Sequence, residues 1–473
     1  MDKATVVIIT LVAYKLVLIA IGLWASRRVH SGDDFFLGGR GLGPVVAAIS
    51  YSSSASSAWT LLGMSGVAYV MGVSALWIVA GSLVGMLVAW CWIAPRLMTF
   101  SRTHNQITLT DFLLHDTDGT MRNAILWVSS LVIIFSFVFY VAAQFQGAGN
   151  TFSSTFELPM NQSIVIGAII IMIYTLLGGF WAVSVTDTLQ GLLMAATAIL
   201  LPAVALLEVG GVSGFLEGLR GVSSATQLSL TAGNGGLVAI GVVVGGLCIG
   251  IGTYGQPHLL VRFMALRDER ALRQARLITI AWYLVVFLGM CFVGLVGHVL
   301  HTDIENPETV FFVLTESLFS PIIGAILLAA VLSAIMSTAD SQLLVAASAI
   351  AHDLGLGRGD PARMMLVSRL TIVVLVALSV LVAIYLPEKI FSRVLFAWIA
   401  LGSAFGPLVF VRLAGVQVVP GAALLAVVLG FVLAVIFYLL PSTPGDIVER
   451  LAPFCVGMLV LLVFGRRSRQ ESY

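Results

Sequence analysis

Apolar segments of about 20 residues follow one another along almost the whole chain, and this pattern limits the fold more than any other feature. Each segment is long enough to cross a hydrocarbon core of roughly 30 Å as a helix. Charged residues make up only 10% of the 473 positions, whereas soluble proteins contain about a quarter. Because unsatisfied backbone groups are costly in lipid, and because the alternation typical of barrel strands is missing, we expect an all-α polytopic membrane protein.

The apolar segments predict thirteen transmembrane helices. The first contains Lys15 and is followed by Arg27 and Arg28 rather than by a small-residue cleavage site, which favours a retained helix over a signal peptide. The predicted segments are 5–26, 44–70, 73–95, 122–148, 163–182, 186–208, 236–257, 274–299, 320–351, 365–386, 391–413, 419–440 and 448–466. An odd number of crossings places the two chain ends on opposite sides of the membrane.

Positively charged residues decide the predicted orientation. If the N-terminus lies outside, most of the 24 lysine and arginine residues, Arg262 among them, fall in inner loops or in the C-terminal tail. Cytoplasmic loops are the ones that collect such residues. The outer side then holds only Lys3, Arg220, Lys389, Arg393 and Arg450. We therefore expect the N-terminus outside and the C-terminus inside.

Two predicted helices are interrupted at membrane depth. Segment 44–70 contains the hydroxyl-rich run from Ser50 to Thr60, which can leave helical geometry because serine competes for backbone hydrogen bonds. Segment 236–257 contains several glycines and ends at Pro257, which lacks a backbone donor. For either segment taken alone, close packing of helices through small residues is an equally good explanation.

The positions of the two interruptions favour a transporter. The first opens a run of five predicted helices and the second opens the next five, and interrupted helices at corresponding positions of two repeats indicate a binding site at the bilayer midplane. An odd number of helices per repeat gives the repeats opposite orientations. The predicted organisation is an extra N-terminal helix and inner loop at 1–43, repeats at 44–208 and 236–413, an outer connector at 209–235, and two C-terminal helices with a short tail at 414–473.

Segment 320–351 carries neutral oxygen atoms that suit a small monovalent cation. Ser337 and Thr338 are adjacent, and the carbonyl of Ala334 lies one turn earlier. Monovalent ions accept neutral oxygens more readily than divalent ions, which usually draw carboxylates. The alternative is that both hydroxyls bond to carbonyls of their own helix.

Charged residues inside the predicted spans are functional candidates because charge is costly in lipid. Asp187 could stabilise the N-terminus of its helix or line the cytoplasmic exit of an ion path. Asp340, one turn after Ser337, could be a second ion ligand or a partner for an inner-loop arginine. For Lys15, snorkelling or a structural contact is the favoured interpretation.

At these residues the sequence resembles the sodium/solute symporter family, and within it the bacterial sodium/proline branch. The resemblance covers nearly the whole chain, and its longest and most specific stretch surrounds Ser337. The matching stretches are Phe36 to Arg40, Gly178 to Asp187, Tyr254 to Ala265, Asn306-Pro307-Glu308, Ala330 to Asp353 and Ala404 to Pro407.

The resemblance implies a leucine-transporter-like fold with two inverted five-helix repeats, and sodium as the coupling ion. It implies a sodium site between the second and ninth helices, in which backbone carbonyls join two hydroxyl groups. The implied ligands are the carbonyls of Ser53, Ser56 and Ala334 and the hydroxyls of Ser337 and Thr338.

The same resemblance implies functional roles outside the sodium site. Asp187 would lie along the exit path of the ion, and Arg40 would act in coupling at the inner end of the second helix. The substrate would lie beside the unwound part of the seventh helix. The residues implied around it are Trp59, Tyr140, Ile249, Thr253 and Pro257.

Three positions depart from the sodium/proline branch. The branch has an acidic residue where this chain has Ala55, and aromatic residues where it has Ile249 and Thr253. These differences affect the ion site and the walls of the substrate pocket. The expected cargo is therefore a small organic solute, either proline or a related amino acid.

The function we expect is sodium-coupled symport by alternating access, carried out by a multi-pass protein of the bacterial inner membrane. One alternative is a proton-coupled transporter that uses Asp187 or Asp340, and another is a substrate-sensing receptor. An enzyme is not expected, because the sequence has no Ser/His/Asp or HExxH constellation. The sequence indicates neither nucleic acid nor an obligatory protein partner.

Overall fold

The computed structural model describes residues 3–26, 37–177, 179–357 and 361–467, and within them the chain is almost entirely helical. Arg27, Arg28, Phe36 and Gly178, which contributed to the predictions above, lie outside the described residues. The main helices are α1 (Lys3–Ser26), α3 (Pro44–Ala58), α4 (Met64–Met71), α5 (Leu76–Val88), α6 (Ala94–Thr103), α8 (Gly119–Phe156), α9 (Met160–Leu177), α10 (Phe180–Glu208), α12 (Gly236–Cys248), α13 (Pro257–Ala265), α14 (Glu269–Leu300), α16 (Pro321–Ser348), α17 (Pro361–Tyr385), α18 (Ile390–Leu413), α19 (Pro420–Leu439) and α20 (Ile447–Phe464).

Among the described residues, 11 helical stretches are long and apolar enough to cross a membrane. One of them, Pro44–Thr103, holds two of the predicted segments. Gly72 divides it, with a φ of +64° that glycine adopts without strain. The predicted segment 163–182 corresponds largely to α9, whose apolar part, Met160–Leu176, is shorter than the others. Each predicted segment thus has a helical counterpart in the structure.

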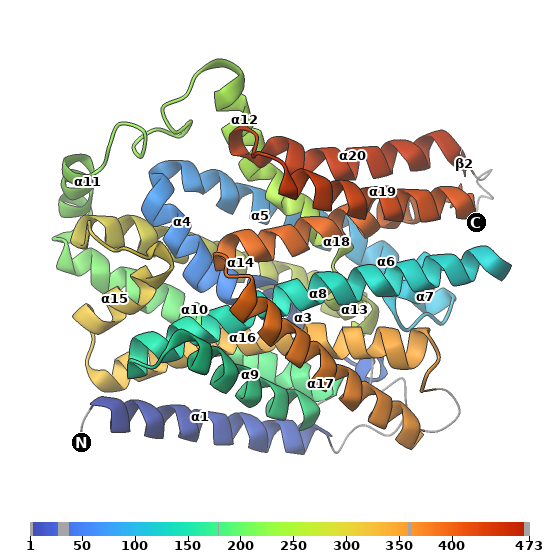
Figure 1. The fold of residues 1–473 in the computed structure, drawn as a ribbon, viewed down its shortest axis with the longest axis horizontal. Helices are drawn as coiled ribbons and strands as arrows, with labels where there is room; N and C mark the ends of the chain where they lie inside the picture. The colour runs from blue at the N-terminus through green and yellow to red at the C-terminus, as the bar shows by residue number, and fades with distance from the viewer. Residues whose placement is uncertain (1–2, 27–36, 178, 358–360, 468–473) are drawn as a thin grey trace.

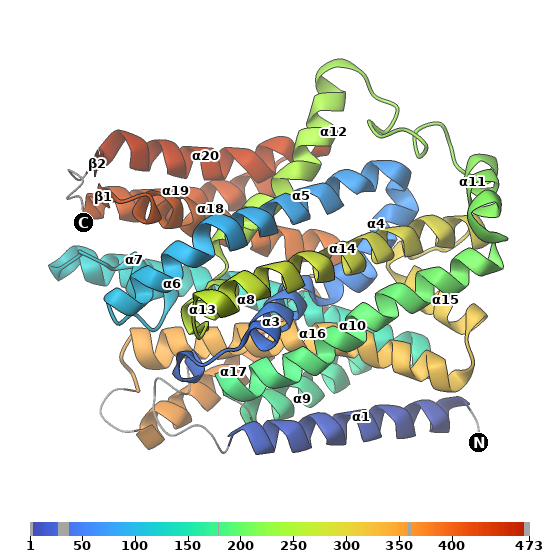
Figure 2. The same cartoon turned by 180° about the vertical axis from the view of Figure 1, so that it is seen from behind.

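The helices form a bundle in which most long axes run between the same two ends (Figure 1). Helix α1 lies along one edge, packed on α10 and α16, and α19 and α20 lie along the opposite edge (Figures 1 and 2). Helices α3, α10, α14 and α16 pack on one another between these edges. The first described residues and the last lie at opposite ends of the bundle.

Both predicted interruptions are present. Helix α3 ends where Ser57 leaves helical geometry, with φ 53° and ψ −173°, and the chain continues through the turn η2 (Trp59–Gly63) into α4. Helix α12 tightens into the 3₁₀ turn η5 (Ile249–Gly255), and Gln256 is extended before α13 begins. Pro257 occupies the first turn of α13, where its missing N–H leaves no helical bond unmade.

Several shorter elements were not predicted. They are α7 (Leu109–Leu113), α11 (Gly211–Val222), α15 (Val310–Leu318) and an antiparallel pair of strands, β1 (Val416–Val418) and β2 (Gly465–Arg467). None of them is long enough to cross a membrane as a helix, so a search for apolar runs passes over them. The two strands also show that the prediction of an all-α chain was incomplete by one small sheet.

Candidate functional site

The break in α3 is held by a side chain from α8. In a continuous helix the Ala58 N–H would donate to the Ser54 carbonyl. Here it donates to Gln144 Oε1 at 3.0 Å, and the Ser54 carbonyl accepts from Thr338 Oγ1 at 3.0 Å instead. The break therefore turns a carbonyl of α3 toward α16, as a cation site built from neutral oxygens requires.

The predicted sodium ligands lie largely together between α3 and α16. Ser337 Oγ donates to the carbonyls of Ser53 and Ala334, each at 3.2 Å. Thr338 is adjacent and, like the others, buried. The Ser56 carbonyl accepts a hydroxyl of its own segment at 2.5 Å. The structure thus brings Ser53, Ala334 and Ser337 into direct contact, places Thr338 beside them, and leaves Ser56 one turn further along α3.

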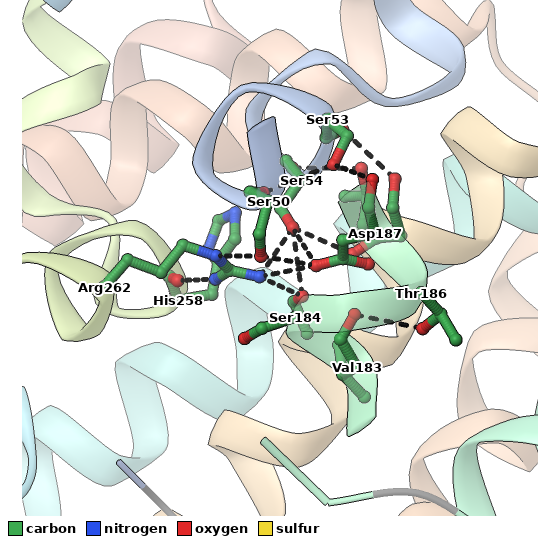
Figure 3. A network of polar contacts seen from close by, with 12 residues as sticks. Ser50, Ser53, Ser54, Val183, Ser184, Thr186, Asp187, His258 and Arg262 are labelled. Atoms are coloured by element: carbon green, nitrogen blue, oxygen red, sulfur yellow. Dashed lines mark hydrogen bonds and ion pairs between the residues drawn. The ribbon is translucent and has the colours of Figure 1, made fainter. Parts of the chain in front are cut away.

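Asp187 and Arg262 form a buried ion pair beside this cluster (Figure 3). The Arg262 guanidinium lies 2.9 Å from Asp187 Oδ2, and the two side chains are only 1% and 0% exposed. Ser50 and Ser54 donate to the same carboxylate oxygen at 2.8 and 3.1 Å. Ser341 accepts from Arg262 at 2.8 Å. These bonds offset part of the desolvation cost of the two charges, while Asp187 Oδ1 is buried without a hydrogen-bond partner among the described residues.

This pair corrects two predictions. Asp187 lies inside α10, which begins at Phe180, so it does not stabilise the N-terminus of that helix. Arg262 was placed in an inner loop, but it belongs to α13 and is buried. The apolar run of segment 236–257 ends before α13, so hydropathy does not indicate that the chain stays inside the bundle there.

Asp340 lies one turn beyond Ser337 on α16 but bonds to a different helix. Ser333, Met336 and Asp340 follow one another at helical spacing, and Ser337 lies on the adjoining side of the same helix. One carboxylate oxygen of Asp340 accepts the hydroxyl of Thr175 on α9. Its other oxygen, Oδ2, is buried and has no hydrogen-bond partner among the described residues. None of the described arginines is therefore its hydrogen-bond partner, so the predicted pairing with an inner-loop arginine is not seen among the described residues.

Arg40 connects three segments at one end of the bundle. It follows two glycines in the turn η1 (Gly38–Arg40) and has a φ of 53°. Its guanidinium donates to the Gln106 carbonyl at 2.7 Å, to Ser101 Oγ at 3.2 Å and to the Met264 carbonyl at 3.4 Å. Arg40 thus joins the chain before α3 to the ends of α6 and α13.

A small cavity lies between the two helix breaks. Four of the five predicted substrate residues, Trp59, Tyr140, Ile249 and Thr253, line it. Trp59 stacks on Phe391, with ring centroids 5.3 Å apart. The full lining is Ala55, Trp59, Ser82, Tyr140, Ile249, Thr253, Tyr283, Phe287, Val394, Leu395 and Trp398.

Pro257 is the exception among the predicted substrate residues. It lines a separate small cavity, together with residues such as Thr108, Val261 and Asp353. Because Pro257 starts α13, the chain has already left the first cavity at that point. The lining residues that the prediction missed come from α5, α14 and α18, which show no interruption in the sequence.

The second break packs tightly against α18. Trp398 Nε1 donates to the Ile249 carbonyl at 3.2 Å, and Gln256 Nε2 donates to the Gly252 carbonyl at 2.8 Å. A Cβ atom on Gly252 would lie 1.9 Å from the Trp398 ring, so only glycine fits there. These contacts supply donors for carbonyls that the unwound segment exposes.

Glu308 ties the segment η6 (Pro307–Thr309) to the wall of the cavity between the helix breaks. Its carboxylate accepts from the backbone N–H groups of Ile390 and Phe391, at 3.1 and 3.0 Å, at the start of α18. Burial raises the pKa of Glu308, and these two bonds act in the opposite direction. Since Phe391 stacks on Trp59, η6 is coupled to a residue that lines the cavity.

We expect Glu308→Ala to weaken the apparent affinity for the transported solute about tenfold. The change removes the acceptor of the buried Ile390 N–H and of the part-buried Phe391 N–H, and a hydrogen bond to a charged group is worth about 1.5–3 kcal/mol. Concentration-dependent uptake measures the effect. Glu305→Ala, an exposed carboxylate two residues before η6, is the matched control. Equal affinities in the two variants would contradict the expectation.

Solved structures share this fold. A Na⁺-coupled sialic acid symporter in its substrate-bound outward-open state superposes with a TM-score of 0.80 at 17% identity, covering 99% of this chain and 100% of that one. Mhp1, a nucleobase-cation-symport-1 family transporter, gives a TM-score of 0.58 at 13% identity, covering 92% and 96%. The amino-acid-bound protein MhsT gives 0.52 at 15% identity, covering 89% of this chain and 97% of that one. The fold is therefore leucine-transporter-like, as expected.

Sequence relatives cover most of the chain. The osmoregulated proline transporter OpuE of Bacillus subtilis (strain 168) is 33% identical over 486 residues, 99% of this chain and 96% of the relative. A sodium/proline symporter of Staphylococcus aureus (strain JH9) is 34% identical over 418 residues, 86% and 80%. The family model described as the sodium:solute symporter family matches residues 35–437. The chain therefore belongs to the sodium:solute symporter family, and it is a multi-pass membrane transporter rather than an enzyme.

Proposed function

We propose that this protein takes up proline, or a closely related amino acid, together with sodium by alternating access across the bacterial cytoplasmic membrane. The observation that carries the proposal is the position of the cavity between the two helix breaks. Trp59 lines it beside the first break, and Ile249 and Thr253 line it from the second. Two relatives named as proline transporters match this chain over most of its length, which supports proline as the transported solute.

The chemistry of the cavity fits a small apolar zwitterion. Its 11 lining residues are apolar, aromatic or hydroxyl-bearing, so the charged ends of an amino acid need backbone partners. The Trp59 N–H donates to Ser57 Oγ at 3.1 Å and to the Ser56 and Ser57 carbonyls rather than to the Ala55 carbonyl, its partner in a continuous helix. The Ala55 carbonyl is therefore proposed to accept the ammonium group. The N-terminal ends of the broken helices favour a carboxylate.

Sodium is proposed to bind at the carbonyls of Ser53, Ser56 and Ala334 and at the hydroxyls of Ser337 and Thr338. An ion there ties α3 to α16 next to the break that also shapes the cavity. Ion and solute then raise each other's affinity, and the effect is reciprocal. Each sodium ion that crosses 100 mV supplies about 2.3 kcal/mol to uptake. Asp187 is proposed to lie on the ion's exit path, and Arg40 to act at the inner end.

The proposed topology has thirteen spans, with the N-terminus outside and the C-terminus inside. The two ends of the described chain lie at opposite ends of the bundle, as an odd number of crossings requires (Figures 1 and 2). The proposed repeats are residues 44–208 and 236–413, each opening on a broken helix. Residues 1–43, 209–235 and 414–473 are then additions to the repeated core.

Uptake by purified protein in proteoliposomes tests the proposal. An inward sodium gradient is expected to drive accumulation of labelled proline, and choline in place of sodium is expected to abolish it. Inhibition of this uptake by unlabelled amino acids and betaines shows which solutes the protein binds best. Accumulation driven by a pH gradient without sodium would show that the protein is coupled to protons instead. Tight binding of proline without accumulation would show that the protein is a receptor instead of a transporter.

A further inference from the structure

Helix α1 lies outside both proposed repeats, yet it carries a lysine that faces the helix proposed to bind sodium. The Lys15 ammonium contacts Met336 Sδ, and the Tyr14 hydroxyl hydrogen-bonds with Ser333 Oγ. Both contacts reach α16, along which α1 packs. Lys15 therefore points into the protein rather than along the lipid toward a membrane surface, which corrects the snorkelling interpretation and keeps the structural one.

The face of α16 that α1 contacts also carries Asp340. Met336 and Asp340 are four residues apart, so they are neighbours on this face. The Lys15 ammonium contacts Met336, one turn before Asp340, and Asp340 Oδ2 is buried without a hydrogen-bond partner among the described residues. The nearby Arg262 is already paired with Asp187. Lys15 is thus a cation that the structure places within one helical turn of Asp340.

We propose that Lys15 is the built-in counter-ion of Asp340 and withholds this carboxylate from transported cations. The inference rests on the proposed function. A buried carboxylate with a free oxygen would attract a mobile cation, and Asp340 lies only two residues from Thr338. The flexible four-carbon stem of lysine lets its ammonium reach one turn along α16. Sodium then binds only through the neutral oxygens around Ser337 and Thr338, and Lys15 acts as a positioning residue.

Replacing Lys15 tests this assignment. Lys15→Met leaves Asp340 uncompensated, so we expect the maximal rate of sodium-driven uptake to fall roughly tenfold or more and its sodium dependence to become steeper as a second ion is recruited. Lys15→Met/Asp340→Asn removes both charges and is expected to restore the sodium dependence of the wild type. Lys15→Arg keeps the charge and is expected to behave like the wild type. Thr10→Val removes another polar group of α1, one that bonds only within the helix, and serves as the control.

Thermal unfolding of the purified variants gives a readout that is independent of transport. Lys15→Met and Asp340→Asn are each expected to lower the midpoint, and the double variant is expected to lie above both. Strictly additive losses would overturn the assignment, as would a Lys15→Met variant with wild-type sodium dependence. If the wild type fails to transport proline, the proposed cargo is wrong, while the unfolding cycle still decides whether Lys15 and Asp340 interact.

Discussion

Ser337→Ala together with Thr338→Ala is expected to abolish sodium-driven uptake while the protein still folds. The two hydroxyls are the only side-chain ligands proposed for the ion, and the other ligands are backbone carbonyls that mutation cannot remove. Ser337 Oγ lies 3.2 Å from the carbonyl oxygens of Ser53 and Ala334. Thr338 Oγ1 lies 3.0 Å from the carbonyl oxygen of Ser54. Each bond between α3 and α16 that is lost costs about 0.5–1.5 kcal/mol of folding free energy, which a helical bundle tolerates.

Uptake and sodium affinity must both be measured in this double variant. Sodium-dependent shifts of the unfolding midpoint report binding without transport, because a ligand stabilises the state that binds it. Thr371→Val is the matched control, since its hydroxyl bonds within α17, at 2.8 Å to Val367. Wild-type sodium affinity in the double variant would remove Ser337 and Thr338 from the ion site.

Arg262→Met is expected to be the most destabilising single substitution considered. It leaves the Asp187 carboxylate buried without its cation, and loss of one partner from a buried ion pair costs about 3–5 kcal/mol. Ser50 and Ser54 continue to donate to the carboxylate, so the protein retains part of its stabilisation. Thermal or denaturant unfolding in detergent, with the yield of folded protein, measures the loss.

A double substitution of the ion pair separates the effect of charge on stability from the effect of packing. Asp187→Asn/Arg262→Met removes both charges and is expected to recover part of the lost stability, as isosteric replacement of buried pairs often does. Arg267→Met, which removes a guanidinium that is 60% exposed, is the surface control and is expected to change stability by less than about 1 kcal/mol. A double variant no more stable than Arg262→Met would indicate that the guanidinium acts through packing alone.

The sequence patterns predicted the helix breaks because serine and glycine clusters act locally on the backbone. The residues next to each break, Trp59 and Thr253, followed from those positions and from the family resemblance. The partners that complete the site could not be predicted in this way. Gln144 and Trp398 lie within continuous helices, and only the folded structure brings them to the breaks.

The contacts between charged residues also could not be predicted from the sequence. The sequence identified Asp187, Asp340 and Lys15 as costly in a membrane, but it could not pair them. Asp187 and Arg262 are separated by 75 positions, and Lys15 and Met336 by 321. Periodicity within one helix contains no information on which distant helix it contacts. The positive-inside count assigned Arg262 to a loop because it weighs sequence position and not burial.

The contact between Gly252 and Trp398 also constrains how this transporter can change its cargo. Any side chain at 252 would collide with the indole, since a Cβ atom there would lie 1.9 Å from its ring. Trp398 lines the cavity, and Gly252 packs against Trp398. A protein that evolves to bind a smaller or larger solute therefore cannot change position 252 first. A smaller residue at 398 has to be fixed beforehand, at the cost of the indole bond to Ile249. The order of substitutions is therefore set by packing, and libraries for redesigned specificity should vary the two positions together.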